Sequence, residues 1–194
     1  MMIQVSDDLV FVYQIDGNDK ITFVDEAWLL FARQNDAPEL TRETVLGHIL
    51  WKFIGDATTV EIYKRLLNRV RATQLPVTVP FRCDSSTRCR YMEMEMVSLG
   101  NGVVQFNSRI LTLEERAEVK LLSSRIDRSA EVVNMCSWCK KIKTAPGCWV
   151  EVEEATREMN LFHTIFPPMI SHGICPDCLE SLQSQLVELG TTLE

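Results

Sequence analysis

The sequence lacks any long hydrophobic segment. No window in its 194 residues approaches the ~18–20 consecutive apolar residues that a membrane-spanning helix needs. The first ten residues, MMIQVSDDLV, also lack the basic start and the apolar stretch of a secretory signal peptide. We therefore expect a cytoplasmic protein with no membrane partner.

The sequence also lacks the common catalytic motifs and has little positive charge. It contains no G-x-x-x-x-G-K phosphate loop, no G-x-S-x-G elbow and no H-E-x-x-H motif. The net charge is −7, and residues 111–194 carry 13 acidic against 8 basic side chains. These absences predict a protein without enzymatic activity and argue against binding to nucleic acid.

What is present is the composition of a globular protein. Apolar residues make up 46% of the chain and charged residues 24%, which excludes a disordered or fibrous protein. The length suffices for one full core and a small appendage. Five of the seven cysteines lie in the last third, so the two ends of the chain have different chemistry.

The first part of the chain predicts a hairpin followed by helices. The apolar runs Leu9–Ile15 and Ile21–Val24 flank the turn-forming residues Asp16–Asp19. An apolar helix is expected after Asp25, over Ala27–Ala32, because acidic residues favour a helix start.

A longer helix and three strands are expected next. The helix starts near Asp56 or Thr58, either of which can cap it, and runs to about Ala72. The pattern then alternates with a period of two, which is typical of strands. The expected strands are 77–83, a segment around Met92, Met94 and Met96, and 103–110, which follows the hairpin turn signal Gly100-Asn101-Gly102.

This order predicts an α+β domain over residues 1–110 with one five-stranded antiparallel sheet. The segments ITFVDEAWLLFA and VLGHILWKFI resemble those of a PAS domain, a sensor module whose sheet and helices enclose a small cavity. The stripe of Met92, Met94 and Met96 is most simply the inner face of the sheet, where it would line any cavity with adaptable side chains. An unrelated α+β domain with the same order of elements is the alternative.

Two cofactors known from PAS domains lack their sequence signals. His48 is the only histidine in residues 1–110, and it lies in a short segment rather than on the longer helix, which argues against haem. The Asn-Cys-Arg-Phe motif of flavin-binding light sensors is absent. We therefore expect neither haem nor flavin.

Residues 111–135 contain neither glycine nor proline, and we expect them to form one connecting helix. Apolar positions repeat at spacings of three and four, with one polar member. They are Val119, Leu122, Ile126, Ser129 and Val133. This stripe can form a homodimer through 111–135, or it can pack on the sheet of the same chain.

The strongest chemical signal is a pair of C-x-x-C motifs in residues 136–194. Cys136 and Cys139 form the first, and Cys175 and Cys178 form the second. Two such turns supply the four sulfurs of a structural zinc site. A hairpin turning at Pro146-Gly147 and a helix that begins near Pro176 complete a treble-clef-like module. An iron–sulfur cluster and a metal-free thiol–disulfide switch are the alternatives.

This segment resembles an element that follows receiver and PAS domains in bacterial signalling proteins. The resemblance rests on Cys136, Cys139, Lys140, Gly147, Trp149 and the run SHGICPDC at Ser171–Cys178. It implies an accessory signalling module. Two features depart from the pattern: an additional thiol at Cys148 and the bulky segment 162–170, FHTIFPPMI.

Two further residues are candidates for roles near the metal. His172 can orient a ligand by hydrogen bonding or replace a cysteine, although four cysteines already fill the shell. Cys148 can be a reactive thiol beside the lysines at 140, 141 and 143, or an inert half-buried residue.

Together these features predict a regulatory protein of signal transduction. A PAS-like domain would sense a ligand or partner, the helix over 111–135 would change its packing, and the zinc module would contact a partner protein. The first alternative is a redox sensor that uses the cysteines as an iron–sulfur or zinc/disulfide switch. The second is a nucleic-acid-binding regulator, which the acidic balance disfavours.

Overall fold

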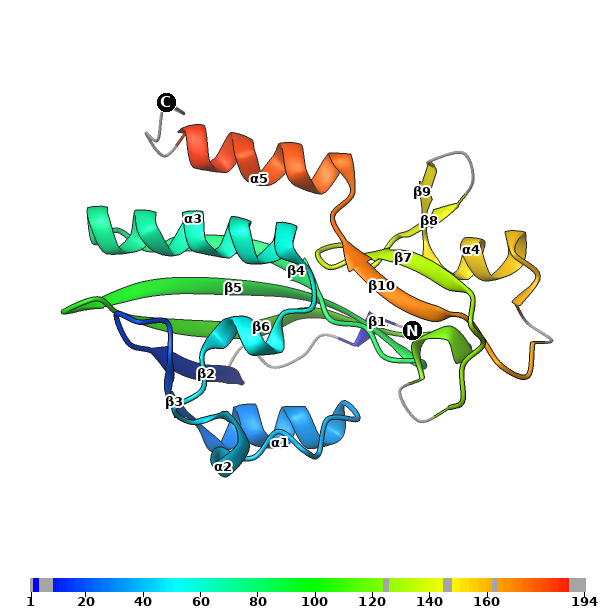
Figure 1. Cartoon of the computed structure of the whole chain (residues 1–194), viewed down its shortest axis with the longest axis horizontal. Helices are drawn as coiled ribbons and strands as arrows, with labels where there is room; N and C mark the ends of the chain where they lie inside the picture. The colour runs from blue at the N-terminus through cyan, green and yellow to red at the C-terminus, as the bar shows by residue number, and fades with distance from the viewer. Residues whose placement is uncertain (1, 4–8, 124–125, 145–147, 162–163, 189–194) are drawn as a thin grey trace.

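The computed structural model describes residues 2–3, 9–123, 126–144, 148–161 and 164–188. It contains two sheets, a large one from the first part of the chain and a small one from the last part (Figure 1). Helix α5 lies alongside α3, on the side of α3 away from the large sheet. Among the described residues, no helix is both long and apolar enough to cross a membrane.

The large sheet confirms the predicted five antiparallel strands. Their order is β3-β2-β6-β5-β4, and a two-residue strand, β1 (Met2–Ile3), pairs with the end of β6. The strands are β2 (Val10–Ile15), β3 (Ile21–Val24), β4 (Val77–Arg82), β5 (Arg88–Gly100) and β6 (Val103–Glu115). Strands β5 and β6 extend beyond the predicted segments, because they pair with each other along almost their whole length.

The helices lie between β3 and β4, as the sequence predicts. They are α1 (Glu26–Gln34), α2 (Arg42–Val45), the 3₁₀ turn η1 (Leu50–Phe53) and α3 (Ala57–Thr73). Asp25 caps α1 by accepting a hydrogen bond from the Trp28 amide, and Asp56 caps α3 by accepting one from the Thr59 amide. Of the two predicted caps for the longer helix, the structure therefore uses Asp56.

The main core lies between α3 and the inner face of the large sheet. Met92, Met94 and Met96 are each 2% exposed or less, which confirms that the methionine stripe faces inward. Met94 and Met96 share their cluster with Leu66 and Leu67 of α3. Their unbranched side chains fill the irregular space beneath the helix.

The β5–β6 hairpin turns where the sequence places Asn101-Gly102. Both residues have positive φ, 50° and 79°, as a two-residue hairpin turn requires. A Cβ at Gly102 would lie 3.0 Å from the Cα of Gly17 in the neighbouring turn. Glycine at this position therefore lets the two turns approach each other closely.

The helix predicted over 111–135 is wrong. Residues 111–115 continue β6, residues 120–122 form the 3₁₀ turn η2 (Lys120–Leu122), and β7 (Val132–Cys136) begins at 132. The backbone pairing of Leu113 and Glu114 with Arg90 and Cys89 overrides the local helix propensity.

Apolar side chains of that segment are buried in a core of the same chain. Val119 and Val133 are 5% and 4% exposed and lie in a second core with Met135 and Ile142. The described residues of 111–135 therefore form no helical seam for a homodimer, and dimerisation itself stays a prediction.

The last part of the chain forms a small four-stranded sheet in the order β10-β7-β8-β9. Its remaining elements are β8 (Ile142–Thr144), β9 (Cys148–Val150), α4 (Val152–Glu158), β10 (Met169–Gly173) and α5 (Pro176–Glu188). The predicted hairpin is the antiparallel pair β8–β9, while its turn at Pro146-Gly147 lies outside the described residues. The predicted helix after the last cysteines is α5.

Candidate metal centre

The structure brings the four predicted cysteines together. The Sγ atoms of Cys136, Cys139, Cys175 and Cys178 all lie within 4.8 Å of one another. Cys136 and Cys175 are buried, whereas Cys139 and Cys178 are partly exposed. The four sulfurs therefore converge on one point from two separate segments of the chain.

The first pair lies in a tight turn between β7 and β8. The Cys136 amide donates to the Lys141 carbonyl at 2.8 Å, and the Lys140 amide donates to the Cys136 carbonyl at 3.0 Å. Lys140 has a φ of 63°, in the left-handed region, which closes the turn on itself. This turn directs the side chains of Cys136 and Cys139 to the same side.

The second pair lies at the start of α5. Pro176 is the first residue of the helix, where the absence of an amide N–H has no cost. The Cys178 amide donates to Cys175 Sγ at 3.4 Å, so the Cys175 sulfur takes the place of a capping oxygen. The positive end of the helix dipole stabilises negative charge on these sulfurs.

Hydrogen bonds within the cluster shift the pKa values of three of the thiols in opposite directions. Hydrogen bonds from Cys139 and Cys178 hold the pKa of Cys136 far below its usual range. The same bonds raise the pKa of Cys139 to about 12 and raise the pKa of Cys178 well above its usual value. The cluster thus favours a thiolate at Cys136 and protons on Cys139 and Cys178, and a cation that replaces those protons would let all of these sulfurs carry negative charge together.

The spacing of the sulfurs fits a single ion. Tetrahedral zinc with bonds of about 2.3 Å separates its sulfur ligands by about 3.8 Å. In this chain Cys139 Sγ lies 3.7 Å from Cys175 Sγ. The donor set and its size are therefore compatible with zinc held by four thiolates.

The cysteine turn is attached to the core of the large sheet. Trp138 Nε1 donates to the Pro80 carbonyl at 2.7 Å, and the Arg82 amide donates to the Trp138 carbonyl at 2.8 Å. Ser137 Oγ donates to Asp56 Oδ2 at 2.8 Å, so the cap of α3 also holds the cysteine turn. Cys136 and Cys175 themselves belong to the main hydrophobic core.

Sequence reasoning did not identify these attachments. In the sequence, Trp138 is recognisable only as a residue between two cysteines, and Asp56 only as a helix cap. An aromatic residue inside a C-x-x-C turn was the one signal for a docking role, because a solvent-exposed turn has no need of an indole.

His172 and Cys148 lie outside the cluster of sulfurs. His172 is on β10, exposed, with its Cδ2 3.9 Å from where a Cβ on Gly55 would lie. Desolvation and the nearby Lys140 lower the pKa of its imidazole, against the influence of Asp56. Cys148 is exposed at the start of β9, where its carbonyl pairs with the Thr144 hydroxyl.

A small cavity lies in the first part of the chain, and its lining residues include Trp28 of α1 and Tyr63 of α3. It measures about 210 Å³ and has four aromatic side chains in its wall, Tyr13, Trp28, Phe53 and Tyr63. Burial raises the pKa of both tyrosines, so both hydroxyls are neutral donors at physiological pH. The Tyr63 ring lies 5.5 Å from the Trp138 ring, so the cavity wall reaches the cysteine turn.

Comparison with known proteins gives only distant structural similarities. No family model matches the chain, and no curated protein matches it. The chain is similar to the photoactive yellow protein domain from the sensor histidine kinase Ppr of Rhodospirillum centenum, at 17% identity and a TM-score of 0.40, over 52% of this chain and 84% of that chain. It is similar to the PAS domain from Bordetella pertussis BvgS at 15% identity and a TM-score of 0.36, over 53% and 72% of the two chains.

The fold class is confirmed by the elements themselves. The first part of the chain is an α+β domain with a five-stranded antiparallel sheet and helices between its third and fourth strands, and a cysteine cluster lies beside it.

Proposed function

We propose that the four cysteines hold one structural zinc ion. The observation that carries this proposal is the convergence of four sulfurs within 4.8 Å, which fills a tetrahedral shell with protein ligands. Zinc bound there would link the β7–β8 turn to α5 and supply folding energy to a sheet whose own core is small. The chain offers no open position for catalysis at that ion.

The same spacing favours a single ion over an iron–sulfur cluster. A [4Fe–4S] cluster binds each cysteine to a different iron atom and a [2Fe–2S] cluster divides them two and two, so some pairs of cysteine sulfurs lie further apart than the ligands of one ion. Four sulfurs that all lie within 4.8 Å of one another suit one shared metal atom.

Metal analysis of the purified protein tests this proposal. We expect about one zinc per chain, negligible iron and no visible absorption, because a zinc–thiolate centre is colourless. Protein purified without air and without added metal should be measured by elemental mass spectrometry. Stoichiometric iron with visible colour would overturn the zinc assignment and support the redox sensor.

We further propose that the protein is a non-catalytic, cytoplasmic regulator of signal transduction. The PAS-like domain would sense a ligand or a partner, and the metal module would respond. Direct contact supports this coupling, since Tyr63 belongs to the cavity wall and packs 5.5 Å from Trp138 in the cysteine turn. This contact takes the place of the connecting helix as the route between the two parts.

Paired tyrosine variants test the coupling. Tyr63→Ala should increase the rate of zinc transfer to a chromogenic chelator several-fold, because Trp138 loses its support. Tyr13→Ala is the matched control, since Tyr13 lies in the same cavity but stacks on Phe106 at 4.3 Å. Equal acceleration in the two variants would show that general destabilisation, not this contact, governs metal release.

We propose a partner protein as the target of the metal module. Large apolar side chains are exposed around β10, including Ile165 at 80%, Phe166 at 51% and Met169 at 43%. Exposed apolar groups of this kind suit a protein surface, whereas the net charge of −7 disfavours nucleic acid. Light scattering of the purified chain distinguishes a second copy from a different protein as the partner, and salt-dependent binding of DNA or RNA would favour the nucleic-acid alternative.

A further inference from the structure

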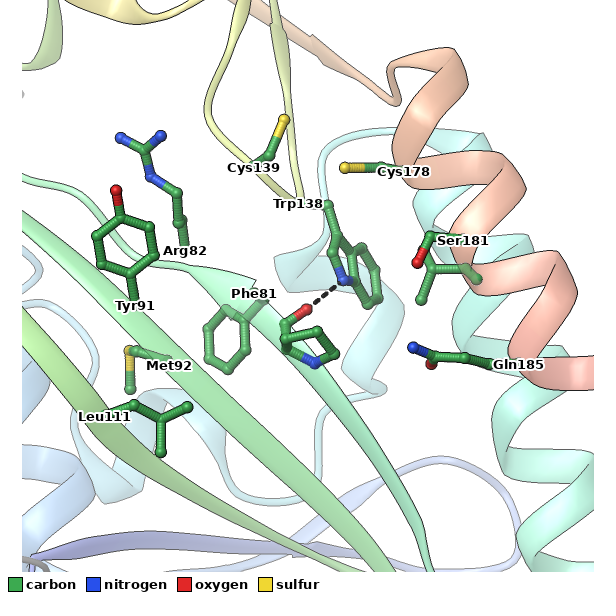
Figure 2. Close-up of a pocket in the computed structure, with 12 residues that line it drawn as sticks. Phe81, Arg82, Tyr91, Met92, Leu111, Trp138, Cys139, Cys178, Ser181 and Gln185 are labelled. Atoms are coloured by element: carbon green, nitrogen blue, oxygen red, sulfur yellow. Dashed lines mark hydrogen bonds between the residues drawn. The ribbon is translucent and has the colours of Figure 1, made fainter.

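A second hollow lies at the junction of the large sheet, the cysteine turn and α5. It measures about 390 Å³, within the range of small-molecule sites. None of its lining residues lines the cavity of about 210 Å³ described above. Figure 2 shows side chains of the sheet on one side, Ser181 and Gln185 of α5 on the other, and Cys139 and Cys178 at one end.

The walls of this hollow are aromatic and apolar. Phe81, Tyr91 and Trp138 provide three rings, and Met92 and Leu111 lie beside them (Figure 2). The indole of Trp138 is fixed in place by its hydrogen bond to the Pro80 carbonyl. Fixed ring faces of this kind favour a flat aromatic ligand, because they offer stacking without the cost of ordering the wall.

The positive charge beside the hollow is already neutralised. Arg82 is the cationic side chain among the described residues that line it. Its guanidinium contacts Asp84 at 2.6 Å and Glu151 at 2.5 Å. Burial works against charge on Arg82, yet these hydrogen bonds outweigh it and raise the pKa of the guanidinium. An anionic ligand would have to compete with two carboxylates and would lie beside the thiolates of Cys139 and Cys178, so the hollow suits a neutral molecule rather than an anion.

Helix α5 contributes one hydrogen-bond acceptor that lacks a donor among the described residues. Gln185 Oε1 is buried and has no hydrogen-bond partner among the residues that the structure describes. Ser181 lies one turn earlier on the same helix and also lines the hollow. A buried acceptor without a donor costs free energy, and a ligand with a hydroxyl or N–H group on its edge would satisfy it.

We propose that this hollow binds a small, neutral, aromatic molecule that carries one hydrogen-bond donor. The rings of the sheet side and of Trp138 would enclose its aromatic part, and its donor would face Gln185. Because Cys139 and Cys178 form part of the wall, an occupant would touch the metal centre directly. This site is separate from the PAS-like cavity, so the proposal goes beyond the function proposed above.

Calorimetric titration of the full-length, zinc-loaded chain with 2-naphthol tests the proposal. Ser181→Trp should weaken binding at least tenfold, because the indole fills the hollow from its rim. Ser184→Trp is the matched control, since Ser184 is exposed on the same helix and does not line the hollow. It should leave the affinity unchanged. Zinc content and thermal unfolding of each variant show that the fold is retained.

A second comparison tests the role of Gln185. The wild-type chain should bind 2-naphthol more tightly than 2-methoxynaphthalene, which lacks the donor, and Gln185→Leu should abolish that preference. Two results would overturn the proposal: no binding at millimolar 2-naphthol, or equal affinities for the Ser181→Trp and Ser184→Trp chains. If Leu50→Trp, which fills the smaller cavity, abolishes binding while Ser181→Trp does not, the probe occupies the PAS-like cavity and the proposal is again wrong.

Discussion

Cys175→Ser is expected to lose the bound zinc and to lower the free energy of unfolding by more than about 3 kcal/mol. Cys175 is 1% exposed and belongs to the main hydrophobic core. Its sulfur also accepts a hydrogen bond from the Cys178 amide at the start of α5. Serine is a poorer zinc ligand, and it places a hydroxyl among apolar side chains. The variant thus loses a ligand, a helix cap and core packing together.

Elemental analysis and urea denaturation measure both effects. Cys148→Ser is the matched control, because Cys148 is exposed and lies outside the cluster. Its stability should stay within about 0.5 kcal/mol of the wild type, with zinc retained. A Cys175→Ser chain that keeps one zinc and its stability would contradict the four-thiolate site.

The shared core also predicts how many unfolding transitions the urea experiment will show. Cys136, Trp138 and Cys175 pack in one cluster with residues of α3 and the large sheet. We therefore expect the wild-type chain to unfold in a single urea transition rather than in two. The prediction of a separate module at 136–194 rests on cysteine spacing, and this measurement tests it.

Local patterns in the sequence predicted the elements that local chemistry determines. Asp25 and Asp56 are caps because a short carboxylate can reach the amide three residues ahead. Asn101-Gly102 turns the hairpin because both positions tolerate positive φ. The convergence of the four cysteines was predicted because a two-residue spacer is itself the geometry of a metal-binding turn.

The errors arose where a distant segment decides the structure. Residues 111–115 have no local reason to be extended, and they are a strand because Arg88–Tyr91 pair with them. Val119 and Val133 have helical spacing, but both pack in the second core, Val119 from the start of η2 and Val133 from β7. The docking of Trp138 on Pro80 joins residues 58 positions apart, a distance at which spacing rules carry no information.

Asp84→Ala is expected to lower the free energy of unfolding by about 3–5 kcal/mol, the cost of breaking a buried ion pair by removing one partner. The Asp84 side chain is 1% exposed and lies 2.6 Å from Arg82 and 3.2 Å from Arg116. Both arginine side chains are 9% exposed. Without the carboxylate, two buried cations would face each other, and among the described residues only the half-exposed Glu151 and Glu153 would remain as their ion-pair partners.

This network also joins the two sheets. Arg82 ends β4 and contacts Glu151, whereas Arg116 follows β6 and contacts Glu153 at 2.9 Å. Both glutamates lie at the start of α4, so Asp84 holds together the groups that fix α4 against the large sheet. Loss of Asp84 should therefore increase amide hydrogen exchange in α4 more than in α1, which has no contact with the network in the ion pairs described.

Glu61→Ala is the control for the effect of charge alone. Glu61 pairs with Arg65 on the surface of α3, where both side chains are about half exposed, and such pairs contribute about 0.3–0.5 kcal/mol. Urea denaturation of the two variants should thus differ by several kcal/mol, although each removes one carboxylate. A cost below about 1 kcal/mol for Asp84→Ala would mean that water reaches Arg82 and Arg116 once the carboxylate is gone. The junction between the sheets would then be held by Trp138 and the cysteines, and not by charge.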